Sequence, residues 1–275
     1  SHRLKILSPE RVSDEINKIL MCDNPSIGFK SLEKMNLLQY IIPELIDLKG
    51  IEEVEGQTHK DNFYHTLEVV DNISKKTNNL WLRWAALLHD VGKAPTKKFD
   101  KKIGWTFYGH EYIGSKMVKK IFKRLSLPLN ESLRYVQKIV MMSSRPIIIS
   151  DDIVTDSAVR RLIYDAGNSI EDLLTLCEAD ITTKNIKKSV KYQNNFKIVR
   201  KKIIDVEERD SIRNFQPPIT GEIIMKHYKI KPCKEIGIIK EKIKNAILDG
   251  EIKNDFNEAF ELMTKIGESM DLKDE

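Results

Sequence analysis

Two imidazoles and two carboxylates, spread widely along the sequence, have the chemistry of metal ligands. The adjacent pair His89-Asp90 ends an almost wholly apolar run over residues 80–88. A helix that is apolar on all sides is usually buried, so we expect this pair at the edge of a dry interior. A carboxylate there is costly unless it is paired or bound to a metal. For the pair alone, a simply solvated helix end remains an equal alternative.

Asp180 and His65 are the other two members of this candidate ligand set. Asp180 shares a helical face with Leu173 and Cys177, and that face should look inward. An inward carboxylate needs a cation, which is either a metal ion or a buried Arg or Lys. His65 lies early in an amphipathic pattern and alone would more often be an ordinary core or surface histidine. Together the four side chains suit one divalent ion such as Mg, Mn, Fe, Co, Ni or Zn.

Four further residues are candidates for contact with a phosphate ester at such a site. Lys93 could meet a phosphate or be a solvated lysine after a helix end. His110 precedes a predicted helix and could protonate a leaving group, or be a surface or supporting histidine. Arg145 and Arg161 could clamp a phosphate bidentately, and each could equally form a structural ion pair. With Asp90, we count Lys93 and His110 as candidate catalytic residues, and Lys93, Arg145 and Arg161 as candidate phosphate-binding residues.

Helical patterns dominate the elements that must position these residues, so we expect an all-α fold. Ser8 and Asp61 or Asn62 are candidate N-caps, and residues 80–88 predict a buried helix. Residues 97–107 alternate weakly around a turn and predict one small β-hairpin, whereas the acidic residues 50–58 indicate a loop. Further helices are expected near residues 31–39, 110–125, 130–142, 156–166, 169–184, 188–209 and 235–249.

Composition sets broad limits on the class of protein. The chain has 275 residues, 41% of them hydrophobic, and a net charge of +5 that is compatible with an RNA or phosphate partner. Its three cysteines lie far apart and form no CxxC motif, so neither a disulfide framework nor a cysteine zinc site is indicated. We see no membrane-length apolar run and no signal peptide, and we expect a cytoplasmic protein. The chain starts at Ser1 without a methionine, so we expect a piece of a longer protein.

The order His65, then His89-Asp90 followed by Gly92-Lys93, then the distant Asp180 resembles the HD phosphohydrolase superfamily. That resemblance implies an all-helical bundle that binds a divalent metal and hydrolyses phosphate esters. More of the chain resembles bacterial tRNA nucleotidyltransferases of the CCA-adding and poly(A) polymerase family. The matching segments are spread over nearly the whole chain, and they are residues 8–15, 59–69, 84–93, 107–111, 176–182, 217–221 and 246–252.

The family resemblance implies a neck remnant over residues 1–50, an HD domain over 51–212 and a helical C-terminal tail over 213–275. The family's catalytic head is missing, because the chain has no DxD pair. We therefore expect that this chain alone cannot add nucleotides. Relatives often carry His-Leu where this chain has Ser143-Ser144. This departure favours a single metal ion and leaves open whether the site is catalytic.

The resemblance also implies tRNA or another RNA as a partner, with small phosphate esters or nucleotides as substrates. Basic side chains of a predicted lysine-rich helix could neutralise RNA phosphates, although a solvated charged face is the alternative for any one of them. They are Lys187, Lys188, Lys191, Arg200, Lys201 and Lys202. Two functions follow: a metal-dependent phosphohydrolase acting on phosphomonoesters, 2′,3′-cyclic nucleotides or RNA ends, or a non-hydrolytic tRNA-binding body. Neither implies a membrane or a particular oligomeric state.

Overall fold

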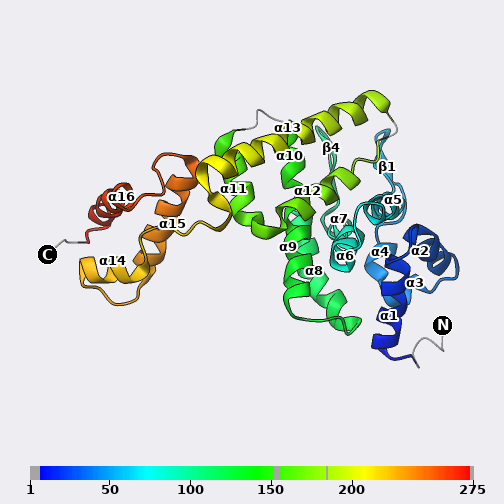
Figure 1. The fold of residues 1–275 in the computed structure, drawn as a ribbon. Coiled ribbons are helices and arrows are strands. Elements are labelled where there is room, and N and C mark those ends of the chain that lie inside the picture. Colours follow the sequence, from blue (N-terminus) through cyan, green and yellow to red (C-terminus); the bar gives the residue numbers. More distant parts are fainter. Residues whose placement is uncertain (1–6, 152–154, 184, 273–275) are drawn as a thin grey trace. The chain divides into compact units, whose positions relative to one another are not determined.

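The protein is described from a computed structural model, which describes residues 7–151, 155–183 and 185–272. These residues are predominantly helical (Figure 1), and this confirms the expected all-α class. The chain divides into two compact units. The site unit comprises Ser1–Asp151 and Asn168–Ile198, and the tail unit comprises Asp152–Gly167 and Val199–Glu275. The domain boundaries expected at residues 50 and 212 come from the family resemblance, whereas the two units are defined by contacts within the structure. Those domain boundaries stay predictions.

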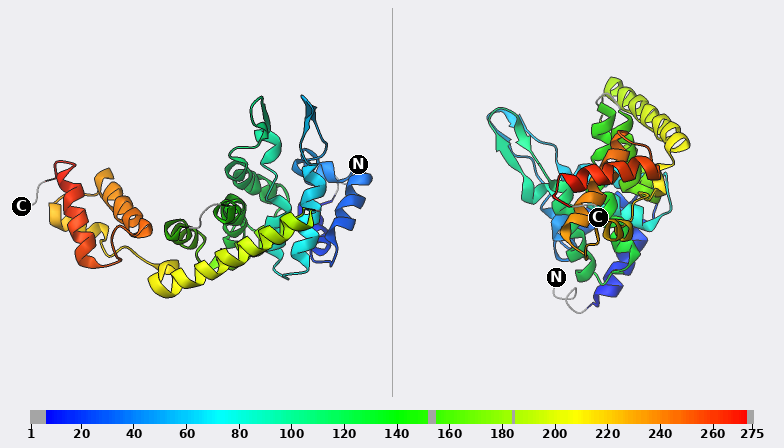
Figure 2. Two further views of the ribbon diagram at one scale, coloured as in Figure 1. Left: turned by 90° about the horizontal axis from the view of Figure 1, so that it is seen from above. Right: turned by 90° about the vertical axis from the view of Figure 1, so that its left-hand side faces the viewer.

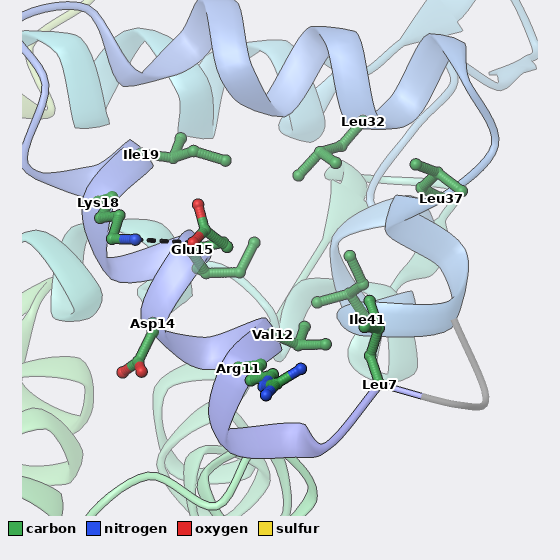
Figure 3. A pocket seen from close by; sticks show the side chains of 11 residues that line it. Leu7, Arg11, Val12, Asp14, Glu15, Lys18, Ile19, Leu32, Leu37 and Ile41 are labelled. Carbon is green, nitrogen blue, oxygen red and sulfur yellow. Dashed lines mark hydrogen bonds and ion pairs between the residues drawn. The ribbon is translucent and has the colours of Figure 1, made fainter. Parts of the chain in front are cut away.

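The site unit begins with four helices, which are α1 (Pro9–Leu20), α2 (Pro25–Lys34), α3 (Leu38–Ile41) and α4 (Pro43–Ile46). The Ser8 side chain accepts a hydrogen bond from the Arg11 amide, which confirms the predicted cap. The second helix lies earlier than the expected 31–39, because Pro25 is well suited to a first helical turn. A hollow of about 510 Å³ is lined by residues of these helices, among them Val12, Ile19 and Leu37 (Figure 3).

The centre of the site unit is a bundle of longer helices. It consists of α5 (Asn62–Ser74), α6 (Leu80–Leu88), α8 (His110–Arg124), α9 (Glu131–Met142) and α12 (Ile170–Ala179). Helix α6 contacts α5, α9 and α12, and its residues from Leu82 to Leu88 are all buried. Asn79 caps α6 and Asp61 caps α5, in each case through a side-chain oxygen that accepts two backbone hydrogen bonds. The predicted helix is thus confirmed over residues 80–88, and its burial is confirmed from Leu82 onward.

Arg83 is a charged residue in the middle of this apolar helix, and only 2% of it is exposed. Its guanidinium donates hydrogen bonds to five oxygens, at distances of 2.6–3.2 Å. The acceptors are the carbonyls of Leu20, Cys22, Ser74 and Thr77 and the side-chain oxygen of Asn78. All the donors of the side chain are therefore satisfied, and one residue ties the ends of α1 and α5 to α6.

Two short antiparallel hairpins occur within the described residues of the site unit. Strands β3 (Lys98–Asp100) and β4 (Gly104–Thr106) pair with Phe99 opposite Trp105, which confirms the hairpin expected over 97–107. Strands β1 (Glu53–Val54) and β2 (Gln57–Thr58) lie in the segment that was expected to be a loop. The Trp105 indole donates to the Gln57 carbonyl at 3.1 Å, so the two hairpins lie side by side (Figure 2).

Three further helices complete the site unit. Helix α7 (Lys93–Thr96) follows the end of α6, and α10 (Arg145–Asp151) follows α9. Helix α13 (Ile186–Asp210) belongs to the site unit up to Ile198. Helix α12 ends at Ala179 rather than near 184 as expected, so Asp180 stands at its C-terminal cap.

The tail unit contains α11 (Asp156–Ala166), the rest of α13, α14 (Gly221–Tyr228), α15 (Lys234–Asp249) and α16 (Phe256–Glu268). Its core is built by α11, α15 and α16, which bury Leu162, Ile243 and Met263. Charged side chains of this unit pair with one another: Arg160 Nε lies 2.7 Å from Asp210, and Arg209 lies 2.7 Å from Asp156. The unit is thus held by a small core and by satisfied surface ion pairs.

All three cysteines are free thiols. Cys22 in the site unit and Cys233 in the tail unit are exposed, whereas Cys177 is buried in α12. Cys177 Sγ donates to the Ser143 carbonyl at 3.0 Å. Across the described residues, none of the helices has both the length and the apolar character needed to cross a membrane.

Candidate metal centre

His89 stands at the point where α6 ends, and only 3% of its side chain is exposed. Its Nδ1 lies 2.8 Å from the Ala86 carbonyl, so Nδ1–H donates to that oxygen in the neutral ring. The Nε2 lone pair is then left for a ligand, and a hydrogen bond that fixes the tautomer in this way is typical of metal-binding histidines. The end of the apolar helix therefore places and orients the imidazole.

His65 occupies the first turn of α5, which Asp61 caps. Its Nδ1 lies 3.0 Å from the Thr182 hydroxyl, and its Nε2 lies 2.8 Å from Asp180 Oδ1. Asp180 comes from the end of α12, so two helices that are far apart in the sequence meet here. A nearby bond also ties them, because Asn72 of α5 donates to the Ala179 carbonyl at 3.0 Å.

Ligand atoms of His65, His89 and Asp180 all lie within 4.8 Å of one another. His89 Nε2 and Asp180 Oδ1 are 3.6 Å apart, and both are buried without a partner at hydrogen-bond geometry. Buried polar atoms without partners are rare in proteins. Two imidazole nitrogens and a carboxylate oxygen are a donor set for a borderline divalent cation, so the residues present fit a metal ion.

Asp90 lies beside this group but is already engaged. Its Oδ2 is 3.3 Å from His89 Nε2 and 3.7 Å from His65 Nε2, yet it is closest to Lys93 Nζ, at 2.7 Å. The structure thus brings all four expected ligands together, with three in mutual reach and Asp90 held by a lysine. Burial opposes ionisation of Asp90, but the facing His89 and Lys93 hold the pKa of its carboxyl well below the usual value.

The charges of the centre stabilise one another. Burial disfavours a charged His89, but Asp90 and Asp180 outweigh it and raise the pKa of the imidazole to about 10. Burial likewise acts against the charge of Asp180, and His65 and His89 lower the pKa of its carboxyl. Without a metal, a proton on His89 therefore balances the carboxylates, and a metal ion would have to displace it.

His110 reaches the centre because two backbones approach closely. A Cβ atom on Gly92 would lie 2.0 Å from the His110 carbonyl, so only glycine fits where α7 begins against the start of α8. Gly114 lies on the other side of the same contact. His110 Nδ1 lies 2.9 Å from the Phe107 carbonyl, and Nε2 lies 3.7 Å from Asp90 Oδ1. The structure therefore places His110 next to the candidate ligands.

The candidate phosphate-binding residues are divided between the two units. Lys93 is there, and Arg145 begins α10 in the site unit, where it is partly buried. Arg161 belongs to the tail unit, and its guanidinium is bidentate to Asp249, at 2.7 and 3.1 Å, and also donates to Asn245. The structural ion pair, which was the alternative for Arg161, is therefore the arrangement observed.

The basic residues expected to bind RNA lie along α13. Four of them are exposed, namely Lys187, Lys188, Lys191 and Lys201. Arg200 and Lys202 are partly buried, and Lys202 Nζ lies 3.1 Å from Asp156. A charged, solvated face is thus present.

Sequence reasoning missed two residues that support the centre. Thr182 orients His65, and it was noted only as the last residue of the resembling segment 176–182. Gly92 was noted only as part of the motif, and its steric role depends on a helix that begins 18 residues later.

Comparison with known proteins gives two family matches and many relatives. Residues 1–48 match a family described as the probable RNA and SrmB-binding site of polymerase A, and residues 62–185 match the HD domain. The A-adding tRNA nucleotidyltransferase of Deinococcus radiodurans is 32% identical over 65% of this chain and 40% of its own length. The multifunctional CCA protein of Shewanella frigidimarina is 31% identical over 66% of this chain and 44% of its own. The CC-adding tRNA nucleotidyltransferase of Thermus thermophilus is 28% identical over 68% and 43%.

The chain therefore spans less than half the length of these relatives. The match over residues 1–48 falls in the site unit, whereas the HD match also runs through residues 152–167 of the tail unit. The HD match includes all four clustered side chains. The chain thus carries an HD domain match over residues 62–185, and about 65% of it is similar to tRNA nucleotidyltransferases, as a C-terminal HD portion of that family would be.

Proposed function

We propose that the centre binds one divalent metal ion and hydrolyses phosphate esters, namely phosphomonoesters, 2′,3′-cyclic nucleotides or RNA ends. The observation that carries this proposal is the pair of buried ligand atoms, His89 Nε2 and Asp180 Oδ1, which lie 3.6 Å apart without a partner at hydrogen-bond geometry, although His65 Nε2 is only 2.8 Å from Asp180 Oδ1. A purely structural cluster would satisfy these atoms internally. The HD match supports the same class of chemistry.

Each residue has a definite part in this proposal. His65, His89, Asp90 and Asp180 would hold the ion, which when bound would acidify a water molecule and draw charge from the phosphoryl group. The Lys93 side chain is 20% exposed beside Asp90, so its Nζ can pair with a phosphoryl oxygen of the substrate. His110 keeps Nδ1 directed at the Phe107 carbonyl, and Nε2 is the atom that would hand a proton to the leaving group.

Hydrolysis can be tested directly on the purified chain. A generic phosphomonoester and a 2′,3′-cyclic nucleotide are incubated with Mg, Mn, Co, Ni or Zn, for the wild type and for Asp90→Ala. Asp14→Ala serves as the matched control, because Asp14 is exposed on α1. We expect turnover with at least one metal, lost in Asp90→Ala and kept in Asp14→Ala. Turnover that is absent with every metal, or equal in both variants, would contradict hydrolysis.

Binding of tRNA without hydrolysis is the second candidate function. The match of residues 1–48 to a family described as RNA-binding favours it, as do the exposed lysines of α13. It predicts that replacing Lys187, Lys188 and Lys191 together by Ala weakens tRNA binding and lowers its salt dependence by roughly one unit per lost contact. A triple Ala variant of Lys119, Lys120 and Lys123, exposed on α8, is the charge-matched control. Equal loss in both triple variants would show a nonspecific effect of charge.

A further inference from the structure

A pocket of about 210 Å³ opens directly beside the metal centre, within the site unit. Its walls are residues 180–183, Tyr192 and Phe196 of α13, Ile147 of α10 and Lys60. Asp180 belongs both to this pocket and to the candidate ligand group. One end of a molecule that fills the pocket would therefore lie next to the metal centre.

The pocket wall is also joined to the ligand group by a hydrogen bond. Thr182 lines the pocket, and its hydroxyl oxygen lies 3.0 Å from His65 Nδ1. Asp180 and Thr182 are two residues apart in the connection that follows α12. One short segment therefore shapes the pocket and holds two of the candidate ligands in place.

The side chains of the pocket suit a flat ring. Tyr192 and Phe196 are four residues apart on α13, so they lie on the same face of the helix. Phe196 is only 2% exposed and forms a fixed apolar wall, whereas Tyr192 is partly exposed. Ile147 and Ile181 add apolar surface, and Thr183 adds a hydroxyl. An aromatic wall beside polar groups is the chemistry that binds nucleobases by stacking, independently of their sequence.

The size and charge of the pocket narrow the ligand further. Ligand pockets usually have volumes of roughly 300–1,000 Å³, so this one has room for a single ring system and not for several nucleotides. Lys60 is exposed and positively charged where it lines the pocket, which suits a ligand that carries a phosphate.

We propose that this pocket holds the nucleobase of the nucleotide whose phosphate is bound at the metal centre, with Tyr192 stacking on the base. The phosphate part of this inference rests on the proposed hydrolase function, whereas the base part depends only on the pocket. The preferred substrate is then a nucleotide, either free or at the end of an RNA chain. A phosphate ester that lacks a base fills the centre but leaves the pocket empty.

Equilibrium binding measured by calorimetry tests the pocket without any turnover. The probes are adenosine 3′-monophosphate and ribose 5-phosphate, which lacks the base. The wild type should bind the nucleotide roughly 5- to 100-fold more tightly, as expected for stacking of one base. Tyr192→Ala should bring the two affinities together, and Tyr192→Phe should keep them apart. Tyr112→Ala, which removes a tyrosine 50% exposed on α8, should behave as the wild type.

Two results would overturn the proposal. One is equal affinity of the wild type for both probes, and the other is a base preference that survives in Tyr192→Ala. Retained tryptophan fluorescence checks that each variant is folded. A dinucleotide with a 3′-phosphate, compared with the mononucleotide, identifies the source of the ligand: tighter binding supports an RNA end, and weaker binding supports a free nucleotide.

The pocket and the hydrolase can fail separately. If no metal gives turnover but the base preference depends on Tyr192, the pocket stands and the hydrolase function is refuted. If turnover depends on Asp90 but Tyr192→Ala leaves the KM for a cyclic nucleotide unchanged, the pocket is refuted and the hydrolase stands. When both hold, Tyr192→Ala should raise KM for the cyclic nucleotide and leave kcat/KM for ribose 5-phosphate unchanged.

Discussion

Charged and polar side chains are used in opposite ways in the two units. In the tail unit, Arg161 donates hydrogen bonds to both carboxylate oxygens of Asp249, and Arg160 forms an ion pair with Asp210. In the site unit, His65, His89 and Asp180 converge with two buried atoms left unpartnered. The ion pairs of the tail unit neutralise each other and stabilise the fold. The His and Asp side chains of the site unit remain available for a ligand.

A third use of charge lies inside the site unit, where Arg83 is buried and fully hydrogen-bonded. It shows that this unit can satisfy a buried charge completely. The unpartnered atoms of the centre are therefore a local property of that site and not a sign of poor packing in the unit.

The same substitution at Arg83 and Arg161 should give the largest contrast between the units. Arg83→Leu leaves four backbone carbonyls without their donor, and the hydrogen bonds to two of them, Leu20 and Ser74, are buried. We therefore expect a loss of about 3–5 kcal/mol in the free energy of unfolding. Arg161→Leu removes an ion pair whose two side chains are each 36% exposed, and we expect a loss of about 1 kcal/mol or less. Urea unfolding followed by circular dichroism measures both. Similar losses would contradict the distinction.

Replacing one carboxylate by an amide in each unit should separate binding from structure. Asp180→Asn removes a charged ligand atom, so we expect metal affinity to fall at least ~100-fold. Asp249→Asn weakens the pair with Arg161 and the hydrogen bond from Ser157, both within the tail unit, and metal affinity should not change. Calorimetric titration with Mn and Zn gives both constants. A metal that binds the wild type and Asp180→Asn equally would refute the assignment of Asp180.

Adding one methyl group to a glycine in each unit should change stability in opposite directions. Gly92→Ala places a Cβ 2.0 Å from the His110 carbonyl, and overpacking of this kind costs about 1–3 kcal/mol. Gly237 lies inside α15 with nothing within 4 Å of the added atom, so Gly237→Ala should stabilise by up to about 1 kcal/mol. Thermal unfolding by circular dichroism reports both shifts. A stabilised Gly92→Ala would show that the contact with His110 is loose.

Acid should weaken the tail unit through Asp210. Hydrogen bonds from Arg209, and then Arg160, lower the pKa of its carboxyl to about 2. Because the folded pKa lies below the ordinary value, the stabilisation is complete above about pH 4 and is lost as the pH falls towards 2. Asp210→Asn should be less stable than the wild type by about 1 kcal/mol at pH 6. The difference should shrink steeply as the pH falls to 2, where about half of the folded molecules carry a protonated Asp210.

Hydrogen exchange of α11 and α15 between pH 2 and 6 follows this loss within the tail unit. Glu208→Gln, a charge-matched change at an exposed position of α13, should leave the profile unchanged. A deficit in Asp210→Asn that stays constant from pH 6 to pH 2 would show that the carboxylate charge does not stabilise the unit.

Local signals in the sequence predicted much of the helical framework. Residues 80–88 form a helix with the expected bounds. Asn79 caps the start of this apolar run, and the polar pair His89-Asp90 follows its end. Ser8 and Asp61 cap helices as their side chains suggest. Helix α16 was not expected, although Asp255 caps it and Ala259 and Met263 are spaced as one buried face.

The arrangement of the centre was less accessible from the sequence. The meeting of His65, His89 and Asp180 followed from their residue types and from family resemblance, and no periodicity gives the distances between helices. The ion pair between Lys93 and Asp90 depends on the turn after α6. Arg161 could be judged only once Asp249, 88 residues further along the chain, was seen to face it.

The free cysteines offer a way to observe both units at once. Cys22 lies exposed just after α1, and Cys233 lies exposed just before α15, so each unit carries one accessible thiol. Burial raises the pKa of the Cys177 thiol well above its usual value, and a thiol that stays protonated reacts slowly. A donor dye and an acceptor dye attached to the two accessible thiols would therefore report the distance between the units by energy transfer, with no cysteine engineered into the chain.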